Sequence, residues 1–190
     1  MTIDLNEFRQ TLGRFATGVC LVTVSDPELG PLATTVNSFS SVSLDPALVL
    51  WSIQNSSDHV QIYTECQHFG ISVLSEEQAG LSGHYAQRGG HEALPEHFSI
   101  GSQGEPQLID ALAHFSCKTY AVYPGGDHQI IVGEVVAFGS TTATPLIFFS
   151  GGYRSLSEQQ AQGLCPIQKR LVIDNTQCSD IAQGIRIGDQ

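Results

Sequence analysis

Residues 111–139, ALAHFSCKTYAVYPGGDHQIIVGEVVAFG, decide the fold of this chain. The first part, residues 111–122, alternates apolar and polar side chains as a half-buried strand does, and 129–139 is a second run rich in Val and Ile. The segment between them, YPGGD, contains the Pro and Gly that tight turns favour. Two such runs joined by a short turn predict a β-hairpin and therefore an antiparallel sheet.

The same pattern extends outward in both directions from this hairpin. Further strand-like runs cover residues 19–25, 32–42, 47–53, 68–74 and 145–150, and the Pro- and Gly-containing segment 26–31 predicts another hairpin loop. Hairpin turns outnumber long crossovers, which favours a mainly β fold whose antiparallel sheet is closed or nearly closed into a barrel.

Three short segments have helical periodicity and are expected at the periphery of the barrel. Residues 5–16 place Leu5, Phe8, Leu12 and Phe15 on one face, and Asp4 is a suitable N-cap. Residues 60–66 form a second helical pattern, with Ser57 or Asp58 as the expected cap, and 76–87 form a third. We therefore expect one domain over residues 1–156, followed by an extension over 157–190.

Composition excludes several classes of partner. The chain has 190 residues, with 19 acidic and 8 basic side chains and a formal charge of −11. Only Lys169 and Arg170 are adjacent basic residues, so the clustered cations that nucleic acid requires are absent from the sequence. Charged residues make up 14% of the chain, against about 25% in average domains. That low fraction indicates a neutral polar surface or burial against another chain.

The sequence favours a cytoplasmic protein that does not span a membrane. Its first residues lack the basic and apolar regions of a signal peptide, and no apolar run approaches the ~20 residues of a membrane span. The five cysteines are odd in number and form no C-x-x-C pair. Disulfide and zinc frameworks are both disfavoured, which fits a reducing compartment.

Common catalytic motifs are missing from the sequence. It contains no H-E-x-x-H and no Cys cluster, so we expect no metal site. It also has no G-x-S-x-G, no P-loop and no G-x-G-x-x-G after a strand. Any redox chemistry must therefore use a nucleotide held by something other than a Rossmann unit.

Two polar stretches allow two interpretations each. Residues 33–43, ATTVNSFSSVS, present hydroxyl and amide groups that suit a flat ligand bearing carbonyls and ring nitrogens, although such a strand can also simply face solvent. Ser57 and Asp58 precede a predicted helix, where plain N-capping competes with binding of an anion. Residue pattern alone leaves both alternatives open.

His128 is the histidine with the clearest chemical setting. It lies where the YPGGD turn meets a strand, so Asp127 or the backbone can fix one ring nitrogen while the other faces a ligand. His84, His91 and His97 lie in the segment 76–110 with no ligand-like spacing, and we interpret them as structural.

Five segments together resemble the flavin reductase-like domain family. They are FRQTLGRFATGVCLVTV (8–24), TTVNSFSSVSLDPALVLWSI (34–53), FGISVLSEEQAGLS (69–82), YPGGDHQIIVGEV (123–135) and PLIFFSGGYRSL (145–156), in the family's order. The resemblance implies an antiparallel Greek-key split β-barrel that binds FMN or FAD and uses NADH or NADPH. It also implies a homodimer that supplies reduced flavin to a separate monooxygenase component.

The resemblance also assigns candidate roles residue by residue. His128 matches the histidine associated with the nicotinamide nucleotide, and is our catalytic candidate. The remaining matches are flavin contacts: ring contacts at Thr34, Thr35, Asn37 and Ser38; ring and ribityl contacts at Ser52, Ile53 and Gln54; phosphate contacts at Ser57 and His59; and Tyr153 and Arg154 near the open face of the flavin.

This chain departs from the family pattern at two of these places. His59 replaces the usual hydroxyl residue and stands beside Asp58, so phosphate binding there is expected to strengthen as the pH falls below roughly 6.5. Trp51 is bulky beside the flavin strand. Two other functions compete with the reductase: a flavin carrier without turnover, and a split barrel that binds another flat cofactor such as haem.

Overall fold

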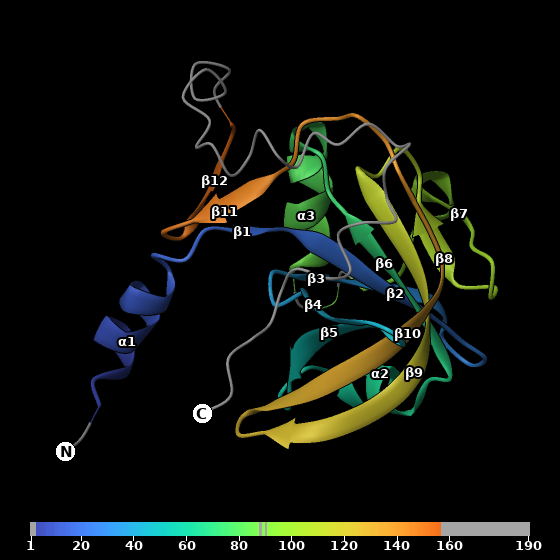
Figure 1. Ribbon diagram of the computed structural model, residues 1–190, viewed down its shortest axis with the longest axis horizontal. Coiled ribbons are helices and arrows are strands. Elements are labelled where there is room, and N and C mark those ends of the chain that lie inside the picture. Colours follow the sequence, from blue (N-terminus) through green and yellow to red (C-terminus); the bar gives the residue numbers. More distant parts are fainter. Residues whose placement is uncertain (1–2, 88, 90, 157–190) are drawn as a thin grey trace. The chain divides into compact units, whose positions relative to one another are not determined.

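The hairpin predicted over residues 111–139 is present in the computed structural model, which describes residues 3–87, 89 and 91–156. Its strands are β9 (Ala113–Gly125) and β10 (His128–Ser140), the long yellow and orange arrows of Figure 1. They pair antiparallel, with Ile131 opposite Val122, and the register shifts at Val132/Gly133 and again at Val135/Ala137. Such irregularities increase local twist and allow a long hairpin to curve around a barrel.

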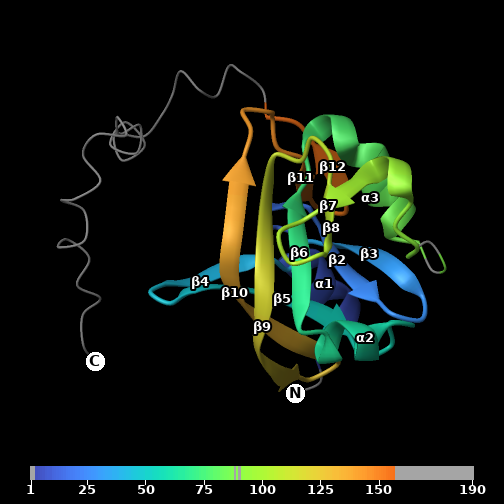
Figure 2. The same cartoon turned by 90° about the vertical axis from the view of Figure 1, so that its right-hand side faces the viewer.

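The hairpin lies inside a seven-stranded sheet in which every pair of neighbours is antiparallel. The strand order is β3-β2-β6-β9-β10-β5-β4, so β3 and β4 are the two edges. Figure 2 shows the β4–β5 hairpin projecting from the β10 side of this sheet. The expected antiparallel barrel is therefore confirmed. The other strands are β2 (Cys20–Asp26), β3 (Gly30–Val36), β4 (Ser40–Leu44), β5 (Ala47–Gln54) and β6 (His68–Val73).

One expected strand is wrong. The run 32–42 is not continuous: β3 ends at Val36 and β4 begins at Ser40, so its two halves lie on opposite edges of the sheet. The chain between them is held to β5 by the Ser38 hydroxyl, which accepts from the Ser52 backbone N–H (2.9 Å) and donates to the Ser52 carbonyl (3.0 Å). The same polar residues therefore bridge the open side of the barrel.

Two apolar clusters explain why β2 is almost uniformly hydrophobic. Val22 and Val24 pack into the barrel interior with Trp51, Phe69 and Ile131. The alternate residues of β2 point the other way: Val19, just before the strand, and Leu21 join a second cluster with Tyr85 and Leu146. A strand buried on both faces loses the apolar–polar alternation of a half-exposed one.

Gly133 is required by close packing at the centre of the barrel. A Cβ atom at this position would clash with the ring of Phe69, which is fully buried, and would lie 3.0 Å from the Cys117 Cβ. The glycine coincides with the first register shift of the β9–β10 hairpin. The missing side chain therefore leaves room for the Phe69 ring of β6 against the β10 backbone.

The three predicted helices are present but shorter than expected. They are α1 (Leu5–Leu12), α2 (Val60–Glu65) and α3 (Ala79–Tyr85), with a 3₁₀ turn (Glu76–Gln78) before α3 and another at Pro95–His97. The Asp4 carboxylate caps α1 by accepting from the Asn6 and Glu7 backbone N–H groups, as predicted. The cap expected at Ser57 or Asp58 is wrong, because His59 occupies the N-cap of α2 and makes no side-chain capping bond.

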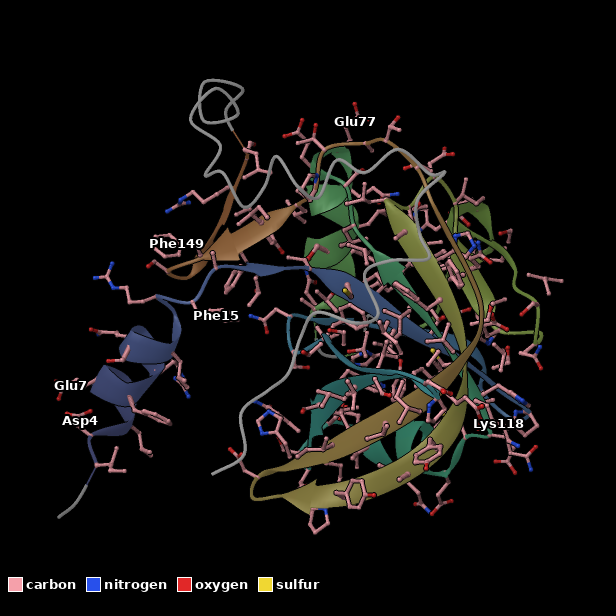
Figure 3. The ribbon with its side chains drawn as sticks, viewed as in Figure 1. Asp4, Glu7, Phe15, Glu77, Lys118 and Phe149 are labelled. Atoms are coloured by element: carbon pink, nitrogen blue, oxygen red, sulfur yellow. The ribbon has the colours of Figure 1, made fainter. Side chains whose placement is uncertain are left out.

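Helix α1 buries none of its residues within this chain. Figure 3 labels Asp4 and Glu7 at its start and Phe15 just beyond its end. Its predicted apolar face, including Phe8 and Leu12, is exposed. An amphipathic helix with an uncovered apolar face is typical of a surface that contacts another molecule.

Two small sheets complete the described part of the chain. β1 (Thr17–Gly18), β11 (Ile147–Phe149) and β12 (Gly152–Arg154) form one, and β7 (Phe98–Ile100) with β8 (Pro106–Leu108) forms the other. Of these strands, only the segment containing β11 was expected. The described elements belong to one compact unit that ends at Ser155, and the predicted extension 157–190 lies outside the described residues. No helix among the described residues is long and apolar enough to cross a membrane.

Candidate active site

A cavity of about 360 Å³ opens where the ends of β3 and β5 meet the start of β10. Most of the predicted site residues line it. From β3 and the segment after it come Thr34, Thr35, Asn37 and Ser38; from β5 come Ser52, Ile53 and Gln54. Ser57 and His128 complete this set.

Sheet register explains why residues far apart in the sequence converge here. His128, the first residue of β10, pairs with Gln54, the last residue of β5. The Asn55 backbone N–H donates to the Asp127 carbonyl (2.9 Å), so the turns after β5 and before β10 are joined. His128 is thereby placed beside the hydroxyl-rich wall of the cavity.

The His128 ring is oriented by its neighbour in the chain. Nδ1 lies 2.7 Å from the Asp127 Oδ1, and this hydrogen bond, together with the charge of a protonated His128, lowers the pKa of the Asp127 carboxyl. An acidic acceptor at Nδ1 favours the tautomer with its proton on Nδ1, which leaves Nε2 to face a ligand. The His128 side chain is 35% exposed.

Two hydroxyls of the predicted flavin contacts are already engaged in holding the cavity wall. Thr35 donates to the Ser82 carbonyl of α3 (2.8 Å), and Ser38 bonds to the β5 backbone. These bonds fix β3 against α3 on one side and against β5 on the other. Ligand hydrogen bonds therefore depend more on Thr34, Asn37 and the backbone than the sequence suggests.

Tyr153 and Arg154 do not line this cavity. Tyr153 borders a neighbouring hollow of about 210 Å³, which shares Thr35 and Asn37 with the cavity, and its hydroxyl lies 2.7 Å from the Ser82 Oγ. Arg154 is exposed, and its guanidinium donates to the Tyr153 carbonyl (2.7 Å). Tyr153 thus lies next to the predicted site, bonded to Ser82 of α3, and the Arg154 guanidinium bonds to the backbone of Tyr153.

His59 lies behind the lining rather than in it. Its ring packs edge-to-face on the ring of His91, with centroids 5.2 Å apart, and His91 is the residue that faces the cavity. Sequence reasoning treated His91 as structural and missed it, because a contact between residues 59 and 91 leaves no spacing signal. The other lining residues not predicted are Val36, Ser56, Asp58 and Ala86.

A larger hollow of about 830 Å³ lies elsewhere, between the β2–β3 turn, the end of α2 and the segment 103–105. Its lining includes the carboxylates of Asp26, Glu28, Glu65 and Glu105. This lining repels a phosphate-bearing ligand. Chemistry rather than size therefore identifies the cavity beside His128 as the candidate site.

The candidate cavity fits a flavin in both size and chemistry. Its volume lies within the range of roughly 300–1,000 Å³ typical of small-molecule sites. Hydroxyl and amide side chains of Thr34, Asn37 and Gln54 match the ring carbonyls, ring nitrogens and ribityl hydroxyls of a flavin, and Ile53 gives an apolar contact. In the described residues, no group of three His, Cys, Asp or Glu side chains is arranged to hold a metal ion.

Comparison with known proteins identifies the family. The flavin reductase-like domain model matches residues 12–157. An NADH-dependent FMN reductase of Agrobacterium fabrum is 44% identical over 152 residues, covering 80% of this chain and 86% of the relative. The reductase component of a trigonelline monooxygenase from Acinetobacter baylyi is 39% identical over 78% of this chain, which spans about half of that longer relative (48%).

Solved structures agree with this assignment. The flavin reductase PheA2 superposes with a TM-score of 0.74 at 35% identity, covering 82% of this chain and all of that one. An NADH:FAD oxidoreductase of Streptomyces globisporus, solved with NAD and FAD fragments, gives a TM-score of 0.74 at 31% identity, covering 83% and 98%. The resemblance inferred from the five sequence motifs is confirmed, as is the split β-barrel. This chain belongs to the flavin reductase-like domain family.

Proposed function

We propose that this protein is an NADH-dependent flavin reductase that binds FMN or FAD in the cavity between β3 and β5. One observation carries the proposal: the predicted flavin contacts of β3 and β5 and the predicted nicotinamide residue His128 line a single cavity. Relatives named as NADH-dependent reductases of FMN, FAD or flavin support the choice of NADH over NADPH.

The β3 and β5 walls hold and orient the flavin. Thr34, Asn37 and Gln54 present polar side chains to the cavity. The backbone of β3 can also bond to a ligand near Thr35, since it is an edge strand whose Ala33 N–H bonds outward to the His91 carbonyl (2.7 Å). Hydrogen bonds to the ring favour negative charge on the reduced flavin. A bound flavin supplies the redox chemistry, because it accepts a hydride from the reduced nicotinamide.

His128 positions the nicotinamide nucleotide. The Asp127 carboxylate holds Nδ1, and the His128 side chain lines the cavity at the start of β10. An imidazole fixed in one tautomer presents a defined hydrogen-bonding group to the second substrate. Its role is to bring the nicotinamide against the flavin and exclude water, which is the main contribution a protein makes to hydride transfer.

The reduced flavin passes to a separate oxygenase component. The cavity rim contains the exposed residues Gln54, Ser56 and Asp58, so a ligand can leave without a large movement of the barrel. Relatives are named as the reductase component of a flavin-dependent trigonelline monooxygenase and as the reductase subunit of a stachydrine N-demethylase. The same division of labour is proposed here.

The protein acts as a homodimer in the cytoplasm. Val136 and Phe138 near the end of β10 are exposed, as is Leu44 at the end of β4, on the other side of β5 in the sheet. A second copy that covers these apolar side chains is the proposed dimer partner. Cys20, Cys66 and Cys117 are free thiols, which fits a reducing compartment.

Flavin titration of two cavity variants tests the location of the site. The chain contains one tryptophan, the fully buried Trp51 next to Ser52, so its emission reports flavin binding through energy transfer. Ser56→Phe fills the rim of the candidate cavity, whereas Ser25→Phe projects into the acidic hollow and is the matched control. We expect Ser56→Phe to weaken FMN and FAD binding by at least about tenfold, a loss of about 1.4 kcal/mol.

The control should bind flavin as the wild type does. A Ser25→Phe variant that loses flavin while Ser56→Phe retains it would place the flavin in the acidic hollow and contradict the proposal. A haem-type absorption band in the purified protein would contradict the choice of ligand.

A further inference from the structure

We propose that His59 and His91 form a proton-linked clamp for the phosphate end of the bound flavin. The inference rests on the proposed function, since it concerns the ligand of the same cavity. It adds a binding residue, His91, which neither the family assignment nor the sequence motifs assign, and it couples His91 to the pH-dependent contact that the sequence predicts at His59.

The two histidines meet although 32 positions separate them in the sequence. His91 is held to the edge of β3: its carbonyl accepts from the Ala33 N–H (2.7 Å), and its Nδ1 lies 3.3 Å from the Ala33 carbonyl. Next to it, the Ala93 N–H donates to the Pro31 carbonyl (2.9 Å). The segment 91–93 is therefore bonded along β3 like a short additional strand, which fixes the His91 ring at the cavity.

The His59 ring contacts His91 from outside the cavity lining. It packs edge-to-face on His91 with an interplanar angle of 89° and a centroid distance of 5.2 Å. Both side chains are partly buried, and His91 lines the cavity together with Ser57 and Asp58. The His91 imidazole thus lines the cavity with Ser57, the hydroxyl residue that the family pattern assigns to the flavin phosphate, and the His59 imidazole packs directly behind it.

A phosphate bound at this end of the cavity would lie beside a carboxylate, and the histidines are the groups that can offset its charge. Among the described lining residues, the ionisable side chains are Asp58, His91 and His128. The chain neighbours of the two histidines are acidic: Asp58 precedes His59, and Glu92 follows His91. The residues that β3 and the end of α3 place near them carry no group that titrates near neutral pH; they are Ala33, Thr35 and Ala86. A phosphate beside the Asp58 carboxylate needs positive charge, and His59 and His91 can supply it when protonated.

Protonation of the pair and binding of an anion support each other. The two imidazole rings lie with their centroids 5.2 Å apart. A phosphate beside them favours their charged form, because a nearby opposite charge stabilises a protonated imidazole. By linkage, flavin binding then takes up protons, and affinity falls as the pH rises and the imidazoles lose their charge.

Titration with FAD and riboflavin tests the clamp. The diphosphate of FAD keeps its charge between about pH 6 and pH 8, whereas the phosphate monoester of FMN titrates near pH 6 and would confuse the profile. Riboflavin has the same ring and no phosphate. We expect the FAD dissociation constant, measured by Trp51 emission, to rise roughly tenfold from about pH 6 to pH 8, while that of riboflavin stays constant.

Substitutions assign the effect to the pair. The variants are His59→Gln, His91→Gln and the double variant, and His68→Gln, in the acidic hollow, is the matched control. The double variant should bind FAD with one weak affinity across this pH range, and His68→Gln should follow the wild type. Arg88 lies outside the described residues, and because arginine stays charged throughout this range it cannot produce the profile.

Calorimetry of the wild type gives a readout that does not depend on how the variants fold. FAD binding near pH 7 in two buffers of different ionisation enthalpy should show net proton uptake. A double variant with the wild-type pH profile, or a wild type that takes up no protons, would overturn the clamp. FAD and riboflavin that both bind without pH dependence refute the clamp alone, whereas failure of every flavin to bind refutes the proposed function.

Discussion

His128 shows how one residue acquires a role from its position in a hairpin. It is the first residue of β10, opposite the last residue of β5, and its Nδ1 is bonded to the exposed carboxylate of Asp127. The PGGDH sequence predicts a turn followed by an oriented histidine, and this local feature is present. What the imidazole faces is set by the β5–β10 register, which belongs to the whole sheet.

Replacing His128 with alanine should weaken the use of NADH without weakening the binding of flavin. We expect the apparent KM for NADH to rise by roughly tenfold or more, because hydrogen bonds to charged groups contribute about 1.5–3 kcal/mol. The flavin dissociation constant should change little, since the β3 and β5 contacts remain. Steady-state kinetics of His128→Ala with saturating flavin measure the first quantity, and Trp51 emission measures the second.

The matched control is His68→Ala, which removes a histidine from the other hollow. It should have wild-type kinetics. Unchanged NADH kinetics in His128→Ala would refute the role assigned to this residue.

Other residues of the site could not be predicted one by one. The hydroxyls of Thr35 and Ser38 suit a ligand in sequence, yet both bond to protein backbone, because each faces a neighbouring segment across the barrel opening. His91 and Ala86 enter the cavity through tertiary contacts alone. Residue type predicts which groups can bind a ligand, and packing decides which of them remain available.

At the scale of elements, the polar stretch 33–43 was predicted as one strand, but it forms parts of two strands. Its Ser, Thr and Val content predicts extended chain, and the chain is extended in both β3 and β4. The break at residues 37–39 has no Gly or Pro to mark it. It exists because the barrel is open there and the chain must cross from one edge of the sheet to the other, which is a property of the topology.

The exposed apolar side chains near the end of β10 should mediate self-association. Phe138 is 77% exposed there, and burying a phenylalanine contributes about 1.5–3 kcal/mol. We expect the wild type to sediment at twice the mass of one chain, and Phe138→Glu to raise the dimer dissociation constant by at least about tenfold. Analytical ultracentrifugation over a range of concentrations measures both.

Ile100 provides the control for these side chains. It is 85% exposed on β7, in a different sheet, so Ile100→Glu adds the same charge on a comparably exposed apolar residue. That variant should remain dimeric. A monomeric wild type, or equal loss of association in both variants, would contradict a dimer through β10.

At the scale of the whole molecule, the acidic net charge is compatible with a phosphate-bearing ligand because several carboxylates lie away from the candidate cavity. Four of the carboxylates gather in the hollow between the β2–β3 turn and α2, away from the candidate cavity, whose wall is built mainly of neutral polar groups. Net charge argues against nucleic acid as a partner, and it says little about the charge of one local site. Strand patterns predicted the barrel because alternation and turns are local. In the two small sheets, β1–β11–β12 and β7–β8, all strands except β11 were missed, because they are only two or three residues long.

The central claim is that flavin bound beside His128 is reduced by NADH, and aerobic NADH oxidation with and without added flavin tests it most directly. The absorbance of NADH is followed with FMN, FAD or no flavin, and NADPH replaces NADH in a parallel series. We predict saturable oxidation that requires added flavin and is faster with NADH than with NADPH. Flavin that binds to the protein while neither nucleotide is oxidised above the rate without protein would contradict the account and leave a flavin carrier in its place.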